Sequence, residues 1–92
     1  MWMDRQRARL CTRRDSYRAI ADGQIPDGML PAQVTHKLTY SLPATLQALE
    51  RIEQGTYGVC VDCQSEIPRA RLQSIPAASR CMDCEKERET RS

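Results

Sequence analysis

The sequence predicts a mainly α protein, in which an N-terminal helical hairpin, a short coiled coil, is followed by a four-cysteine finger and a C-terminal helix. Three observations predict this fold class. Two Cys-x-x-Cys pairs, Cys60/Cys63 and Cys81/Cys84, are separated by seventeen residues. Apolar residues recur at helical spacing in two stretches ahead of the first pair. A short segment rich in Gly and Pro separates those two stretches.

The first predicted helix covers residues 3–21, where Gly and Pro are absent and good helix formers are frequent. Met3, Leu10 and Tyr17 recur every seven residues, and Ile20 follows three residues after Tyr17. This spacing predicts a narrow apolar seam suited to one partner helix.

Positive charge gathers in this first helix. Residues 1–21 hold six Arg against two Asp, although the formal net charge of the whole chain is only +2. Contact with nucleic-acid phosphates is one interpretation, and a solvated helix face is the simpler one. The Arg residues concerned are Arg5, Arg7, Arg9, Arg13, Arg14 and Arg18, with Arg69, Arg71 and Arg80 further along the chain.

A turn is predicted between the two helical stretches. Asp22 and Asp27 each precede a Gly, and Pro26 presets the backbone angle that a turn requires. Pro31 is well placed in the first turn of the next helix. Residues 22–31 are therefore the predicted tip of the hairpin.

The second stretch is helical from residue 31 to about residue 54. Pro43 interrupts it, because its ring clashes with the carbonyl of Thr39, so a kink or a short break is expected there. Gly55 can end the helix in a left-handed conformation. The apolar seam resumes in phase after Pro43 and comprises Leu38, Leu42, Thr45, Leu49 and Ile52.

The spacing of Cys60, Cys63, Cys81 and Cys84 is typical of a zinc site. Zinc suits four thiolates because it is borderline-soft and redox-inert, and a four-thiolate site keeps no open position. One structural zinc ion is therefore predicted. It would contribute on the order of 10 kcal/mol to the folding of a small chain that has no Phe.

Three other uses of the cysteines stay open at this stage. Two disulfides require an oxidising compartment, and no secretory signal is recognised at the start of this sequence. A redox Cys-x-x-Cys usually occurs once, beside a βαβ pattern that is not predicted here. An iron–sulfur site is the third. Cys11 is expected to be a buried or half-buried spectator, and His36 an exposed or hairpin-facing helix residue.

The finger offers few apolar side chains for its own packing. Ile67, Leu72 and Ile75 are the expected ones, and residues 82–91 are expected to extend as a helix. No apolar run approaches membrane-spanning length, so no membrane contact and a cytoplasmic location are expected. The closed metal site, without a nucleophile–base pair or a phosphate-binding loop, argues against an enzyme.

From about residue 48 to residue 87 the sequence resembles the DksA/TraR family of bacterial and phage zinc-finger proteins. The cysteine separation and the surrounding residues agree together, over a little under half of the chain. The matching positions are Ala48, Leu49, Glu50, Arg51, Ile52, Gly55, Thr56, Tyr57, Gly58, Val59, Cys60, Ile67, Pro68, Arg71, Leu72, Pro76, Cys81, Met82, Asp83 and Cys84.

The resemblance implies a transcription regulator that binds RNA polymerase rather than promoter DNA. In this family the helical arm enters the secondary channel of the polymerase, and acidic residues at its tip act near the catalytic magnesium ion. Some full-length members work with the nucleotide ppGpp, and short members work without it. Direct DNA binding is therefore not expected. The alternative function is a small zinc-binding module that contacts nucleic acid or another protein through its Arg-rich N-terminal helix.

The sequence departs from the family pattern in its N-terminal half. The arm is short, and the acidic tip motif of the family, Asp-x-x-Asp-x-Ala, is absent. Asp22 and Asp27 are the nearest tip candidates, with Asp4 as a second possibility, and a purely turn-forming role for Asp22 and Asp27 stays open. The predicted division is an arm over residues 1–56 and a finger with its C-terminal helix over residues 57–92.

Overall fold

The structure, a computed structural model, describes residues 1–91 and is mainly helical, as predicted. Within those residues no strand forms, and the nearest feature to one is an isolated antiparallel bridge between Val59 and Glu66. No helix of the described part is long and apolar enough to cross a membrane. The helical elements in chain order are α1 (Trp2–Ala21), α2 (Pro31–His36), η1 (Lys37–Ser41), α3 (Leu42–Gln54), α4 (Arg69–Ser74) and α5 (Met82–Arg91).

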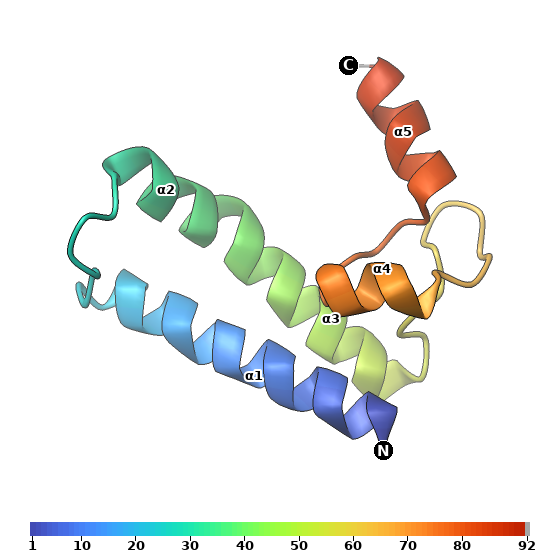
Figure 1. The fold of residues 1–92 in the computed structure, drawn as a ribbon, viewed down its shortest axis with the longest axis horizontal. Coiled ribbons are helices and arrows are strands. Elements are labelled where there is room, and N and C mark those ends of the chain that lie inside the picture. Colours follow the sequence, from blue (N-terminus) through green and yellow to red (C-terminus); the bar gives the residue numbers. More distant parts are fainter. Residues whose placement is uncertain (92) are drawn as a thin grey trace.

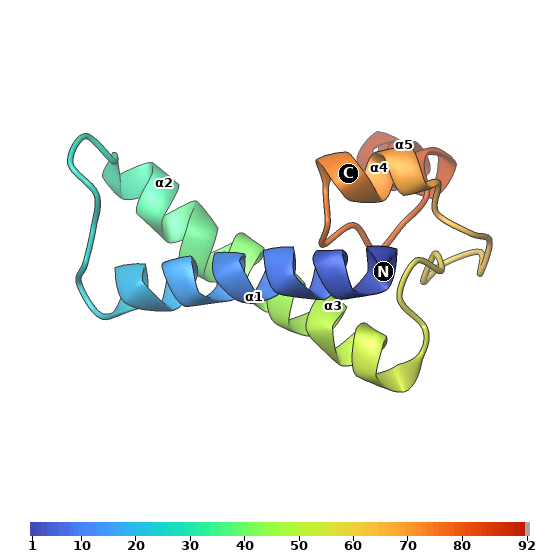
Figure 2. The same cartoon turned by 60° about the horizontal axis from the view of Figure 1, so that its bottom comes forward.

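The arm is an antiparallel helical hairpin. α1 packs against α3 and η1, and the loop of residues 22–30 joins α1 to α2 at the end far from the finger (Figures 1 and 2). With 20 residues, α1 is about 30 Å long at 1.5 Å per residue. The N-terminus lies beside the finger, so the tip and the cysteines are at opposite ends of the molecule (Figure 1).

Pro43 does not break the second helix of the hairpin. η1 is a π turn in which the N–H of Leu42 donates to the carbonyl of Lys37, five residues earlier. Ser41 keeps helical backbone angles, φ −70° and ψ −44°. The wider turn accommodates a residue that has no N–H, because it relieves the contact between the Pro ring and the preceding turn. Of the two predicted alternatives, the short break is therefore wrong, because the helix continues through a π turn, and the kink stays a prediction.

Gly55 ends α3 as the sequence predicts. Its φ is +77°, and the N–H of Thr56 donates to the carbonyl of Arg51 at 2.9 Å. A left-handed residue at this point caps the last turn and redirects the chain. The redirected chain leads straight into the finger.

One apolar cluster serves both the arm and the finger. Ile52 and Leu10 are buried as predicted, whereas Met3 is 39% exposed and that prediction was wrong. Gln6 is 2% exposed and takes the buried position that the predicted seam assigned to Met3. It is buried there because its amide reaches hydrogen-bond partners in the finger. The buried members of the cluster are Leu10, Ala48, Ile52, Tyr57, Cys60, Ile67, Leu72 and Ala78. The division at residue 56 stays a prediction.

The packing of the finger differs from the prediction at one residue. Ile67 and Leu72 are buried, but Ile75 is 46% exposed. Ile75 directly follows α4 and precedes Pro76, which favours an extended backbone, and its φ and ψ are −131° and 85°. Its side chain consequently lies outside the core, and the buried ring of Pro76 takes the inner position.

Candidate metal centre

The structure brings the four predicted cysteines together. The sulfur atoms of Cys60, Cys63, Cys81 and Cys84 all lie within 4.8 Å of one another. The sulfurs of Cys63 and Cys81 are 3.7 Å apart. A tetrahedral zinc ion with Zn–S bonds of about 2.3 Å separates its sulfurs by roughly 3.8 Å. The donor set and its spacing therefore fit a zinc ion.

Backbone hydrogen bonds shape the first cysteine pair. The N–H of Cys60 donates to the carbonyl of Ser65 at 2.8 Å, and the N–H of Gln64 donates to the carbonyl of Cys60 at 2.9 Å. Gln64 has a φ of +64°, which closes this tight turn. The N–H of Val61 donates to the carbonyl of Ser79 at 2.9 Å, so the two cysteine pairs are held side by side.

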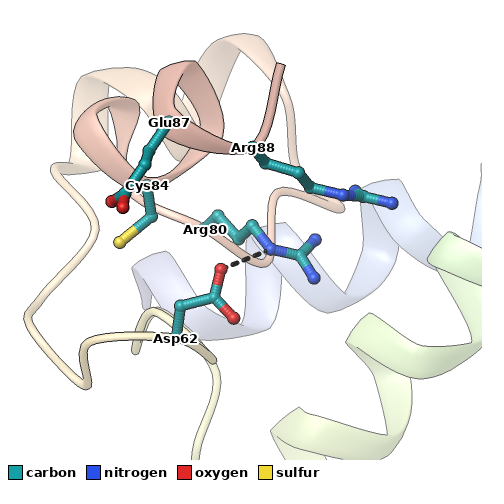
Figure 3. Close-up of a pocket in the computed structure, with 5 residues that line it drawn as sticks. All are labelled: Asp62, Arg80, Cys84, Glu87 and Arg88. Carbon is teal, nitrogen blue, oxygen red and sulfur yellow. Dashed lines mark hydrogen bonds and ion pairs between the residues drawn. The ribbon is translucent and has the colours of Figure 1, made fainter. Parts of the chain in front are cut away.

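The second pair is placed by the start of α5. Cys81 directly precedes the helix, Cys84 lies in its first turn, and the N–H of Glu85 donates to the carbonyl of Cys81 at 3.0 Å. Figure 3 shows Cys84 on α5 with its sulfur directed toward the loop that carries Asp62. Arg80 donates to Asp62 at 2.7 Å across the same region, so an ion pair supports the approach of the two loops.

The acidities of the thiols diverge within the cluster. A hydrogen bond from the backbone N–H of Cys63 is the main reason that the pKa of Cys60 falls to about 6. Hydrogen bonds from Ser65 lower the pKa of Cys63. The neighbouring thiol of Cys81, followed by those of Cys60 and Cys63, raises the pKa of Cys84. Four thiolates cannot share this volume unless a cation stands among them, and a divalent metal supplies that charge.

The geometry separates zinc from a disulfide at this site. A disulfide bond needs sulfurs about 2.05 Å apart, and the Cys63–Cys81 separation of 3.7 Å is far longer. All four cysteines are free thiols in the structure. When bound, zinc would cross-link the two loops and supply no open position for a substrate.

The predicted tip residues lie at the other end of the molecule. Asp22 caps the C-terminus of α1 with φ −82°, and Asp27 belongs to the loop before α2. Both are exposed, and so are the neighbouring side chains of Ile25 and Leu30, at 47% and 62%. The loop thus presents two carboxylates together with two apolar side chains.

Several of the arginines of α1 are used within the chain. Arg9 donates to the carbonyl of Gln73 in α4 at 2.6 Å. Arg14 pairs with Asp15 at 3.2 Å. Arg7 lies 3.8 Å from Glu53 of α3. Two of these arginines are paired with carboxylates, and the third is directed toward the backbone of α4. The arrangement argues against one continuous phosphate-binding face.

The sequence interpretation missed the contact between α1 and the finger. The amide of Gln6 donates to the hydroxyl of Tyr57 at 3.1 Å and to the carbonyl of Leu72 at 3.0 Å. One signal was available: Gln6 lies three residues after Met3 and four before Leu10, which is the spacing of the seam itself.

The two remaining residues singled out in the sequence lie outside the cluster of four cysteines. His36 is exposed, and its ring centroid lies 5.3 Å from that of Tyr40. Cys11 is half-buried.

Comparison with known proteins agrees with this geometry. Residues 55–89 match the family described as prokaryotic dksA/traR C4-type zinc finger. These residues are therefore similar to a DksA/TraR zinc finger. A 45-residue segment is also 51% identical to an uncharacterized protein of Aquifex aeolicus (strain VF5), covering 49% of this chain. That segment spans only 31% of the Aquifex protein.

Two solved structures share the DksA-like fold over nearly the whole chain. The structure of transcription factor DksA2 from Pseudomonas aeruginosa matches 97% of this chain and 84% of its own, with a TM-score of 0.71 at 23% identity. The second, an RNA polymerase binding protein and transcriptional regulator Dks from Chlamydia trachomatis L2 (LGV434), matches 95% and 91%, with a TM-score of 0.62 at 29% identity. The likeness therefore includes the arm, where the sequence resemblance is weakest.

Proposed function

We propose that this protein is a transcription regulator that binds RNA polymerase. The observation that carries the proposal is the structural likeness, over 95% of the chain, to a protein described as binding RNA polymerase. The similarity of residues 55–89 to the DksA/TraR finger also supports it, and the structural likeness extends beyond the finger to the arm.

In this proposal the two ends of the molecule have different tasks. Cys60, Cys63, Cys81 and Cys84 hold one structural zinc ion, which keeps the finger rigid at the base of the arm. The arm enters the secondary channel of the polymerase. Its tip lies about 30 Å from the base, the length of α1, and brings Asp22 and Asp27 toward the active-site region.

The chemistry proposed for the tip is electrostatic. A carboxylate close to a catalytic metal ion or to its ligands changes the local field without forming a covalent bond. Turnover by the protein itself is not expected, since a metal site closed by four thiolates has no position for a substrate.

The test compares three zinc-loaded proteins: wild type, the double variant Asp22→Asn/Asp27→Asn, and the control Asp15→Asn. Asp15 is also an exposed Asp of the arm, but it lies on α1, about 10 Å along the helix before Asp22. In a pull-down, core RNA polymerase from the organism that makes this protein should retain all three proteins. Only the double variant should lose the effect on transcription from a ribosomal promoter in vitro.

Two results would count against the proposal in different ways. If wild-type protein at micromolar concentration is not retained by core polymerase, the proposed partner is wrong. If the double variant alters transcription as strongly as wild type does, Asp22 and Asp27 are turn residues only, and the active part of the arm lies elsewhere.

A further inference from the structure

Hydrogen bonds, and not apolar contact alone, fasten the N-terminal turns of α1 to the finger. The buried Nε2 of Gln6 donates to the hydroxyl of Tyr57 at 3.1 Å and to the carbonyl oxygen of Leu72 at 3.0 Å. Arg9 donates from Nη1 to Oε1 of Gln6 at 3.0 Å, and from Nη2 to the carbonyl of Gln73 at 2.6 Å. We call the side chains of Gln6, Arg9 and Tyr57 the polar joint.

The direction of each bond in the polar joint is determined by chemistry. The carbonyl of Leu72 can only accept and the guanidinium of Arg9 can only donate, so the amide of Gln6 has one possible orientation. Tyr57 accepts from Gln6 and donates its own hydrogen to the carbonyl of Pro76 at 2.8 Å. The bonds therefore run in one sense from Arg9 to Pro76, and each polarises the next.

The environment of the polar joint makes other arrangements unfavourable. Gln6 is 2% exposed and Tyr57 is 7% exposed, and burial raises the pKa of the Tyr57 hydroxyl. A buried donor or acceptor that loses its partner is not rescued by water. Apolar contacts alone would tolerate sliding or rotation of the finger on α1, whereas directional bonds tolerate very little.

The polar joint lies where it can determine the orientation of the finger relative to the arm. The finger is covalently continuous with α3 at Gly55 and Thr56, and one attachment of this kind permits rotation about the connecting backbone. The polar joint is a second attachment, from α1. Two attachments, one to each helix of the arm, define an angle.

We propose that Gln6 is a positioning residue that fixes the angle between the DksA/TraR finger and the helical arm. The angle is a property of the isolated protein. Its consequence, that a polymerase docked on the finger receives the arm in one direction, rests on the proposed function.

The experiment uses zinc-loaded full-length protein and four forms of it: wild type, Gln6→Met, Tyr57→Phe and the control Gln54→Met. Methionine keeps the length of glutamine without its hydrogen bonds, and Tyr57→Phe removes the hydroxyl alone, which covers the case in which Gln6→Met does not fold. Gln54 is an exposed glutamine of α3 whose amide bonds only to Glu50 among the interactions described for it. Residual dipolar couplings of the backbone amides in α3, α4 and α5 report the relative orientation of arm and finger.

One alignment tensor should fit all three helices in wild type and in Gln54→Met. In Gln6→Met and Tyr57→Phe, the couplings of α4 and α5 should no longer fit the tensor of α3, while bound zinc stays equal. Affinity for core polymerase should fall roughly tenfold in both variants, because Gln6 and Tyr57 belong to one hydrogen-bond network. Affinity should be unchanged in Gln54→Met.

Unchanged couplings in the folded Gln6→Met and Tyr57→Phe proteins would overturn the positioning role, even if both melt at lower temperature. Changed couplings with unchanged polymerase affinity would overturn the link to docking. If wild type itself does not bind polymerase, the proposed function fails, and the couplings still decide the role of Gln6.

Discussion

Tyr57 shows how one side chain joins the two halves of the molecule. Its ring lies 6.3 Å from the ring of Trp2 on α1, and its hydroxyl accepts from Gln6 and donates to the carbonyl of Pro76. Three residues later the chain reaches Cys60, the most buried of the four clustered cysteines. The contact with the arm and the metal centre are thus built on adjacent parts of the same loop.

The buried hydroxyl of Tyr57 makes stability sensitive to alkaline pH. Burial raises its pKa above the ordinary value of 10.0, so the folded protein keeps this proton at a pH where the unfolded chain releases it. The stabilisation is fully present below pH 10 and is lost as the pH rises through the folded-state pKa. The free energy of unfolding should therefore fall more steeply above pH 10 in wild type than in Tyr57→Phe, as measured by chemical denaturation. Parallel pH profiles would contradict this.

Replacement of one cysteine should remove both the metal and the structure of the finger. In Cys81→Ser the site loses a thiolate, and the remaining donors hold zinc more weakly, so metal content should fall and the finger should unfold. A chelator should have the same effect on wild type, because zinc contributes on the order of 10 kcal/mol to small fingers. Cys11→Ser, a half-buried cysteine far from the cluster in sequence, is the control and should keep its zinc. Full zinc content and an unchanged melting temperature in Cys81→Ser would show that the cluster is not the metal site.

At the scale of elements, caps and turns decide where each helix ends and which way the chain then runs. The π turn of η1 accommodates Pro43, which lies just after it in α3. The hydroxyl of Thr45 in α3 donates to the carbonyl of Ser41 at 2.8 Å. Gly55 then turns the chain out of α3 toward the cysteines. The direction of the finger therefore depends on backbone features as well as on the polar joint.

Gly55→Ala should destabilise the protein through backbone strain alone. No heavy atom lies within 4 Å of the position that a Cβ would take, so there is no steric clash, but φ is +77°. A left-handed conformation is about 1 kcal/mol less favourable for Ala than for Gly, which corresponds to a melting temperature roughly 4–8 °C lower in a domain of this size. Gly55→Asn should lose less, because Asn tolerates this region better. Equal melting temperatures for wild type and Gly55→Ala would contradict the strain.

The sequence predicted the features that depend on local chemistry. The helix boundaries near Ala21 and Gln54, the cap at Gly55 and the clustering of the cysteines follow from spacing and from single residue types. The role of Gln6 could not be predicted in this way, since its partners are 51 and 66 residues away in the sequence. The prediction for Ile75 was wrong for a different reason: the extended backbone before Pro76 directs its side chain out of the core, whatever its hydrophobicity.

At the scale of the whole molecule, the fold places the finger at one end and the tip of the arm at the other. The structure measures 39 × 36 × 20 Å, and the cysteine cluster and the loop of residues 22–30 lie at opposite ends (Figure 1). Ile25 and Leu30 are exposed apolar side chains of that loop, and a partner that binds the tip would cover them. The proposed polymerase channel is such a partner.

The most direct test asks which end of the molecule approaches the polymerase active centre. A photo-crosslinking amino acid is placed at position 25 in one protein and at position 75 in another. Ile25 and Ile75 are the same residue type with nearly equal exposure, 47% and 46%, but one lies at the tip and the other in the finger. Position 25 should crosslink to polymerase segments around the catalytic magnesium ion, and position 75 should crosslink only outside the channel or not at all. Crosslinks near the active centre from position 75 but not from position 25, or none from either, would contradict insertion of the arm.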